Sequence, residues 1–298
     1  MADATGAIGA IGSVVRPART ESVRRNRGPG RWFVLAALLA LLALFLFPFL
    51  LAVTNAIKSA ADYAANGPLG IPHSFSLAAL GAFWQHVDFT RKLINSTVLS
   101  GAVALIAVAL SLLNAYAIGI GRVRGSRFIL ILLLIGIMIP QEALVYPLYL
   151  MAKAAGLFDS LISCIIVFSV LQSAFGTYLL ASVLTAFPRE IVEAARVDGA
   201  NSWQILVYVV TPIIAPTLAV LATFFFIWTW NEFLLPLVLL VSNDNQTVSV
   251  AMGVLSGQYV SDPTTTAAAA LLGLAPTVIF FLIFQRTLTR GVVVGAVK

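Results

Sequence analysis

Two pairs of polar residues interrupt long apolar stretches of the chain and are its first candidates for binding chemistry. Gln141 and Glu142 form one pair, and Asn231 and Glu232 form the other. Amide and carboxylate side chains can hydrogen-bond the hydroxyl groups of a polar solute, and ionisable groups at membrane depth mark functional sites. The same residue types are also typical of the boundary where an apolar helix meets lipid headgroups. Both interpretations of these four residues remain open at this point.

Other kinds of chemistry find little support in the sequence. Cys164 is the only cysteine, so neither a disulfide nor a Cys-rich metal site can form within the chain. His73 and His86 are isolated in one loop, where solvated histidines are more common than metal ligands. None of the lysines follows a glycine, so the phosphate-binding pattern G-x-x-x-x-G-K-[ST] is missing. We therefore expect a non-catalytic protein with no metal site and no cofactor.

The elements that must position the polar pairs follow from composition. Of the 298 residues, 60% are hydrophobic and 10% are charged, and the mean hydropathy is +0.99. An ordinary soluble protein has about 25% charged residues. The composition therefore predicts an all-α integral membrane protein and excludes a disordered chain, a disulfide scaffold and a nucleic-acid-binding module. A membrane-crossing helix needs about 20 apolar residues. The stretches long enough to cross are residues 32–53, 94–120, 128–150, 161–187, 207–241 and 267–284.

Two of these six stretches are irregular. Residues 128–150 contain Pro140 and Pro147. Residues 207–241 are too long for one crossing, because a helix of this length would rise about 52 Å against a hydrocarbon core of about 30 Å. We expect the helix in this stretch to end near Trp230 and an irregular outer segment to follow it.

The distribution of lysine and arginine predicts the orientation of the chain. Fourteen of the 18 lie in the N-terminal tail, in the C-terminal tail, or in the segments after the second and fourth stretches. The positive-inside rule puts these parts, and hence both termini, in the cytoplasm, as an even number of spans also requires. The expected organisation is a flexible basic tail (1–31), a first transmembrane helix (32–53), an outer loop (54–93), a five-helix core (94–285) and a cytoplasmic tail (286–298).

The segment between the fourth and fifth stretches is the most informative part of the chain. Pro188 suits the first turn of a helix, and Gly199 suits a left-handed C-terminal cap. Asn201 or Ser202 can then cap a second short helix. The pattern predicts a helix–glycine–helix elbow over residues 188–207 at the cytoplasmic surface. An amphipathic helix resting on lipid is the alternative, although such helices favour Lys and Arg over the acids present here.

The elbow sequence EAARVDGANSWQ resembles the EAA loop of ABC-importer permeases, EAA-x3-G-x9-I-x-L-P. The matching residues are Glu193, Ala194, Ala195, Gly199 and Pro212. The chain departs from the pattern at Val209 and Thr211, at the entry to the fifth stretch. The strings IPQEALVYPLYL, WNEFLLPLVLL and RGVVVGAVK resemble the carbohydrate branch of these permeases. The similarity to the six-span, maltose-type subunit extends from about Asn95 to Lys298.

This resemblance implies a permease subunit of an ATP-driven, binding-protein-dependent sugar importer in the bacterial inner membrane. The subunit would form part of a translocation path that works by alternating access. Its partners would be cytoplasmic ATPase subunits, a second, homologous permease, an extracytoplasmic sugar-binding protein and membrane lipid, with no nucleic acid. The residues that would couple it to the ATPase are Glu193, Ala194, Ala195, Asp198, Gly199 and Trp203. An ion pair of Glu193 with Arg189 or Arg196 within one helix is the simpler alternative.

The remaining implied sites lie at the outer side. Gly257, Gln258 and Tyr259 are the candidates to contact the binding protein, and the two polar pairs are the candidates to line the path. An ABC importer for another small solute is the nearest alternative function. A stand-alone secondary transporter is a further alternative, but such proteins often show internal repeats and midplane charges.

Overall fold

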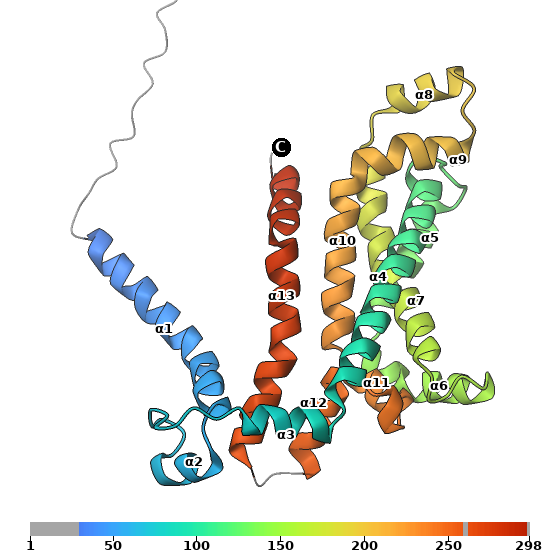
Figure 1. The fold of residues 1–298 in the computed structure, drawn as a ribbon. Helices are drawn as coiled ribbons and strands as arrows, with labels where there is room; N and C mark the ends of the chain where they lie inside the picture. The colour runs from blue at the N-terminus through green and yellow to red at the C-terminus, as the bar shows by residue number, and fades with distance from the viewer. Residues whose placement is uncertain (1–29, 259–261, 297–298) are drawn as a thin grey trace, which may run out of the picture. The chain divides into compact units, whose positions relative to one another are not determined.

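The computed structural model describes the backbone of residues 30–258 and 262–296, and the side chains of residues 30–254 and 262–285. All regular secondary structure in these ranges is helical (Figure 1). The expected all-α class is therefore confirmed for the part of the chain that the structure describes. Within these described ranges, five helices are long and apolar enough to cross a membrane, and a bent pair would make a sixth. The number of crossings and the side on which each terminus lies stay predictions.

The chain divides into two compact units, residues 1–47 and 48–298. The described part of the first unit belongs to α1 (Gly30–Ala56), a helix with a mean hydropathy of 2.9 over its most apolar window. Every residue from Gly30 to Phe47 is exposed. This apolar surface is suited to lipid, and the expected first span (32–53) lies inside the helix. Most of the expected basic tail, residues 1–29, lies outside the described residues.

The second unit contains all of the remaining helices. The α-helices are α2 (Ala60–Asn66), α3 (Ala78–His86), α4 (Phe89–Gly119), α5 (Ser126–Met138), α6 (Gln141–Ala154), α7 (Leu161–Thr185), α8 (Arg189–Val197), α9 (Ser202–Gln204), α10 (Thr211–Asn231), α11 (Leu234–Leu239), α12 (Val248–Gln258) and α13 (Pro263–Ala296). A π-helical segment covers Ile205–Val210, and a 3-10 turn covers Asn243–Asn245. The expected outer loop thus holds two short helices, and the expected tail after residue 285 continues α13 as far as Ala296.

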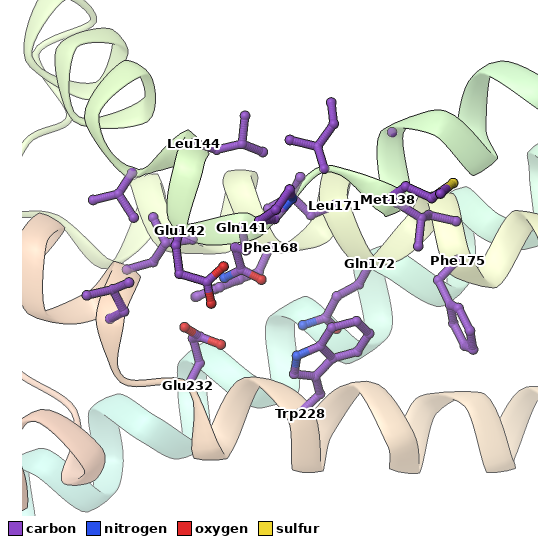
Figure 2. A pocket seen from close by; sticks show the side chains of 17 residues that line it. Met138, Gln141, Glu142, Leu144, Phe168, Leu171, Gln172, Phe175, Trp228 and Glu232 are labelled. Carbon is purple, nitrogen blue, oxygen red and sulfur yellow. The ribbon is translucent and has the colours of Figure 1, made fainter.

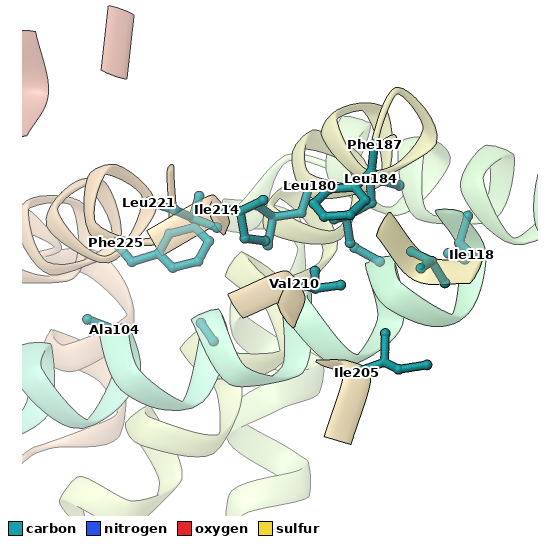
Figure 3. Close-up of a cluster of buried hydrophobic side chains, with 14 residues drawn as sticks. Ala104, Ile118, Leu180, Leu184, Phe187, Ile205, Val210, Ile214, Leu221 and Phe225 are labelled. Carbon is teal, nitrogen blue, oxygen red and sulfur yellow. The ribbon is translucent and has the colours of Figure 1, made fainter. Parts of the chain in front are cut away.

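Helices α4, α7 and α10 pack together as the centre of the second unit (Figure 3). Gly176 of α7 marks their closest approach, because a Cβ built there would lie 2.2 Å from Ser111 Oγ and 2.9 Å from Phe225 Cζ. Small residues allow helices to approach closely, which is the main source of packing energy between helices in lipid. Ser111 Oγ donates a hydrogen bond to the carbonyl of Ala107 at 2.6 Å, within its own helix, so the hydroxyl is satisfied in this apolar contact.

The stretch over residues 128–150, expected to make one crossing interrupted by prolines, is divided into two helices. Helices α5 and α6 meet at Pro140 and are bent by 95° relative to one another. Proline has no N–H to continue a helical hydrogen-bond ladder, and it drives the preceding residue toward an extended backbone. Ile139 accordingly has φ −69° and ψ 123°. The presence of a proline was visible in the sequence, but the size of the bend was not.

The long fifth stretch behaves as expected at its outer end. Helix α10 ends at Asn231, Glu232 has an extended backbone with ψ 131°, and the short α11 follows. At its other end α10 differs from the expectation, because α9, the π-helical segment and α10 form one continuous helical rod from Ser202 to Asn231. The N–H of Thr211 reaches the carbonyl of Leu206, five residues back. This wider turn accommodates Pro212, which would clash with a carbonyl in a regular α-helix.

Asp62 organises the loop after α1. Its carboxylate accepts hydrogen bonds from Asn66 Nδ2 at 2.6 Å and from the backbone N–H of His73 at 2.9 Å. His73 Nδ1 lies 3.5 Å from the same carboxylate. The hydrogen bonds of Asn66 and then His73 hold the pKa of Asp62 below its ordinary value, because they favour the ionised form. The Asp62 carboxylate thus links the start of α2 to the chain eleven residues later.

Candidate functional site

The predicted elbow forms, and local sequence explains its shape. Helix α8 follows Pro188 and ends at Val197, Asp198 is its C-cap, and Gly199 then turns the chain with φ +84°. This left-handed conformation is open to glycine and costly for most other residues. Asn201 and Gln204 form a capping box, since the side chain of each accepts from the backbone N–H of the other, at 2.9 and 2.8 Å. The turn between α8 and α9 is therefore specified by its own residues.

The elbow presents apolar side chains outward. Val192 anchors α8 to the helical core and is 6% exposed. Val197 is 89% exposed and Trp203 is 63% exposed, beside exposed Ala194 and the backbone of Gly199. Within the second unit, α8 and α9 lie at the opposite end from α6, α11 and α12 (Figure 1). Exposed apolar groups on a small, well-defined knob are typical of a surface that contacts a partner.

Glu193 is exposed on α8 and has no ion-pair partner in the part of the chain that the structure describes. The two arginines on the same helix, Arg189 and Arg196, are at the right spacing for a pair but lie beyond ion-pair distance. The described residues thus contain no ion pair of Glu193 with either arginine of α8. Glu193 lines a hollow together with these two arginines, and its side chain is exposed.

A second site lies at the bend between α5 and α6. It is a cavity of about 380 Å³ between this bend, the middle of α7 and the end of α10. Gln141, Glu142 and Glu232 line it, so the structure brings three of the four predicted path residues together. Figure 2 shows the carboxylates of Glu142 and Glu232 turned toward each other across the opening. The cavity contains two acids and no basic residue among its lining side chains.

Asn231 does not belong to this cavity. Its Nδ2 donates to the carbonyl of Ile227 at 2.7 Å, and its side chain lines a different, more apolar hollow with Trp230. Adjacent residues on a helix point about 100° apart, so two neighbouring polar residues at a helix end need not face the same space. Asn231 and Glu232, although adjacent in sequence, therefore line different hollows in this structure.

Gln172 is the cavity residue that the four predicted positions leave out. It is 2% exposed, and its Nε2 donates to Thr229 Oγ1 at 2.8 Å. Its Oε1 has no partner within the described residues, and neither has the buried Nε2 of Gln141. Trp228, Phe168 and Phe175 add aromatic surface to the same wall. A polar side chain within an otherwise apolar helix was the available signal for Gln172.

This cavity combines unpaired hydrogen-bonding groups with flat aromatic faces. Buried polar groups normally have partners, and leaving one unsatisfied costs about 1–3 kcal/mol. A solute that supplies hydroxyl groups and a partly apolar face would satisfy both features of the wall. The cavity is therefore suited to a polar small molecule with a partly apolar face.

Two other expectations concern the contact with an outer partner and metal binding. The side chains of Gly257, Gln258 and Tyr259, expected to contact an outer partner, lie outside the residues that the structure describes. Among the side chains that are described, no three His, Cys, Asp or Glu residues gather in a way that could hold a metal ion.

Comparison with known proteins agrees with these features. Residues 117–294 match the family described as "Binding-protein-dependent transport system inner membrane component". A putative ABC transporter permease of Streptomyces antibioticus is 33% identical over 228 residues, which is 76% of this chain and all of the relative. The trehalose transport system permease SugB of Mycobacterium tuberculosis is 32% identical over 273 residues, covering 90% of this chain and 97% of the relative.

The fold is also found in a solved structure. A chain of a bacterial ABC transporter for the acidic polysaccharide alginate superposes with a TM-score of 0.74 at 23% identity. The match covers 86% of this chain and 95% of that chain. With a family match over more than half its length and relatives above 30% identity along most of it, this chain belongs to the inner-membrane components of binding-protein-dependent transport systems.

Proposed function

We propose that the chain is a permease subunit of an ATP-driven sugar importer, coupled to separate ATPase subunits through the elbow of α8 and α9. The observation that carries this proposal is the elbow itself: a helix, a left-handed glycine and a capped second helix, with apolar side chains exposed. Its family membership supports a transport role, and the trehalose permease among its relatives supports a sugar as the solute.

The proposed topology has six spans, with α5 and α6 together counted as one bent span and both termini in the cytoplasm. The excess of Lys and Arg at the elbow end supports this orientation. A second, homologous permease would complete the path, and an extracytoplasmic binding protein would deliver the sugar. Such transport needs no catalytic residue in this chain, because ATP would be hydrolysed in the partner.

The elbow is well suited to transmit movement. Residues Ser202–Asn231 form one continuous helical rod from the elbow to the wall of the polar cavity. A displacement of the elbow by the ATPase would therefore be carried to Trp228 and Glu232 without an intervening loop. ATP and the loaded binding protein can drive alternation only by binding the outward-facing state better than the inward-facing state.

Within this scheme Glu193 contacts a basic residue of the ATPase. Its carboxylate has no partner in the described chain, and Val197, Trp203 and Ala194 would exclude water around it. Removing one member of a desolvated charge pair costs about 2–5 kcal/mol. The path in turn is proposed to include Gln141, Glu142, Gln172 and Glu232, which line the polar cavity.

A mild-detergent pull-down of the tagged chain from its native membranes tests the proposal. We expect an ATPase and a second permease to be recovered with the wild-type chain. Glu193→Gln keeps the size of the side chain and removes its charge, so ATPase recovery should fall sharply, while Glu193→Asp should retain part of it. Equal membrane abundance of the wild-type chain and its two variants is the control.

Two outcomes would contradict the proposal. Recovery of the chain alone, under conditions that keep other membrane complexes intact, would favour a stand-alone transporter. Recovery of an ATPase together with a binding protein that holds a solute other than a sugar would retain the coupling role and replace the sugar by that solute.

A further inference from the structure

A basic hollow lies on the inner side of the elbow, between α8, the end of α7 and the turn that joins α4 to α5. Its volume is about 450 Å³. Four of its lining side chains are arginines: Arg122, Arg127, Arg189 and Arg196. Glu193 is the one acidic residue in the lining. The hollow therefore has a formal excess of three positive charges, drawn from two segments more than sixty residues apart in sequence.

The four arginines have no partners of their own. Within the described part of the chain, none of their guanidinium groups forms a hydrogen bond or an ion pair. Arg122 also has φ +49°, in the left-handed region that non-glycine residues seldom occupy. Backbone strain of this kind persists where the surroundings demand it and is found most often at binding sites.

The floor of the hollow is apolar. Ile118, Leu184 and Phe187 line it and also belong to the main hydrophobic core; Figure 3 shows them toward the same end of that core, away from Ala104 and Phe225. Val192 of α8 closes the floor. An apolar floor below a rim of arginines suits an amphipathic anion better than a small hydrated ion.

The hollow also opens where a lipid-exposed helix begins. Helix α5 starts at Ser126, has no buried residue, and carries Phe128 at 70% exposure in its first turn. The acyl chains of a lipid could follow this surface while its headgroup stays among the arginines. Guanidinium groups bind phosphate through charge-assisted hydrogen bonds, and basic pockets at the cytoplasmic ends of membrane helices bind anionic headgroups.

We propose that this hollow binds the phosphate headgroup of an anionic phospholipid. The bound headgroup would join α8 to the α4–α5 turn, because its phosphate would contact arginines from both segments at once. The lipid would hold the elbow in place from its inner side and leave Val197 and Trp203 free on its outer side. This site is separate from the proposed sugar path, and it shares Glu193 with the surface proposed to contact the ATPase.

The test is lipid retention by the full chain, purified with its co-purifying partners and analysed by native mass spectrometry. Delipidated protein is titrated with phosphatidylglycerol, which is anionic, and with phosphatidylcholine, which is zwitterionic. We expect tighter retention of phosphatidylglycerol. Arg122→Gln and Arg196→Gln should each weaken it roughly fivefold, and the double variant more strongly, as expected for the loss of one or two arginines near an anionic headgroup.

Arg124→Gln is the matched control, because Arg124 lies in the same turn and does not line the hollow. It should change retention less than twofold. An equal loss in Arg124→Gln would mean diffuse surface attraction and would overturn the proposal. All these arginines are exposed, so their replacement should leave the thermal unfolding temperature unchanged, which the same samples report.

Two further arms separate other ligands from a lipid. In the first arm, millimolar inorganic phosphate raises the thermal unfolding temperature of the wild type but not of the double variant, and phosphatidylglycerol raises neither. The site would then bind a free anion, and the lipid proposal would be wrong. If the double variant retains phosphatidylglycerol but loses the ATPase in a pull-down, the hollow receives an acidic segment of that partner instead, which also overturns the proposal.

Discussion

Replacement of Gly199 gives the sharpest test of the elbow. Its φ of +84° lies in the left-handed region, and apart from Gly199 itself and its two chain neighbours no residue has an atom within 4 Å of the position that a Cβ would occupy. The backbone conformation, and not the available space, therefore limits which residue types can replace Gly199. A left-handed backbone costs an ordinary L-residue about 1–2 kcal/mol, whereas asparagine adopts it more readily.

The expected effect follows from the small size of α8. A helix this short has little stability of its own, so strain at Gly199 acts directly on the population of the bent elbow. A cost of about 1–2 kcal/mol corresponds to a factor of about 5–30 in that population. Because apparent affinity falls with the fraction of competent conformation, ATPase binding by Gly199→Ala should weaken by the same factor.

The measurement is the amount of ATPase recovered with the tagged chain, at matched membrane abundance, for Gly199→Ala and Gly199→Asn. Asparagine is larger than alanine but better suited to the left-handed conformation. If backbone strain decides, Gly199→Asn should recover more ATPase than Gly199→Ala, whereas if crowding decides, it should recover less. We expect Gly199→Asn to stay within about threefold of the wild type. If alanine is tolerated and asparagine is not, the argument from backbone conformation is refuted.

Three other perturbations test separate parts of the structure. Gly176→Ala should destabilise the chain by about 1–3 kcal/mol, because the new methyl group has no room in the central helix contact. Gly101→Ala is the control, because the space around its Cβ is open, and it should be neutral or stabilising. Thermal unfolding in detergent compares the two variants. Glu142→Ala and Glu232→Ala should each raise the apparent KM for uptake about fivefold or more if these carboxylates hydrogen-bond the solute, whereas unchanged uptake in the double variant would support a headgroup-boundary role. The folded-state pKa of Asp62 lies below its ordinary value of 3.8, so its contribution to stability is complete above pH 3.8 and is lost as pH falls through the lower folded value. Proteolysis of the loop after α1 should accelerate in that acidic range, and Asp62→Asn should remove this dependence on pH.

Much of the fold could be predicted because its signals are local or compositional. The mean hydropathy alone requires a membrane protein, and the apolar stretches locate the long helices, although α13 extends beyond its stretch and the stretch 128–150 is broken into α5 and α6. The elbow was equally predictable, because Gly199 and Asn201 specify their own backbone conformations without help from distant residues. The resemblance to importer permeases rested on this segment and on the strings IPQEALVYPLYL, WNEFLLPLVLL and RGVVVGAVK.

The site depended on contacts that no local pattern records. The size of the bend at Pro140, the inclusion of Gln172 and the outward turn of Asn231 are all decided by how α5, α7 and α10 pack. The direction of a side chain at a helix end changes by about 100° per residue, so a small shift in where α10 ends exchanges the residues that face the cavity.

The sequence by itself determined that this is an all-helical membrane protein with a glycine elbow between its long helices. Only the tertiary structure decided that Glu193 has no partner on its own helix, and that arginines from α8 and from the α4–α5 turn share one hollow. The physical reason is one of range. Hydrophobicity, caps and left-handed glycines act within a few residues, whereas cavities and charge clusters arise where segments distant in sequence pack against one another.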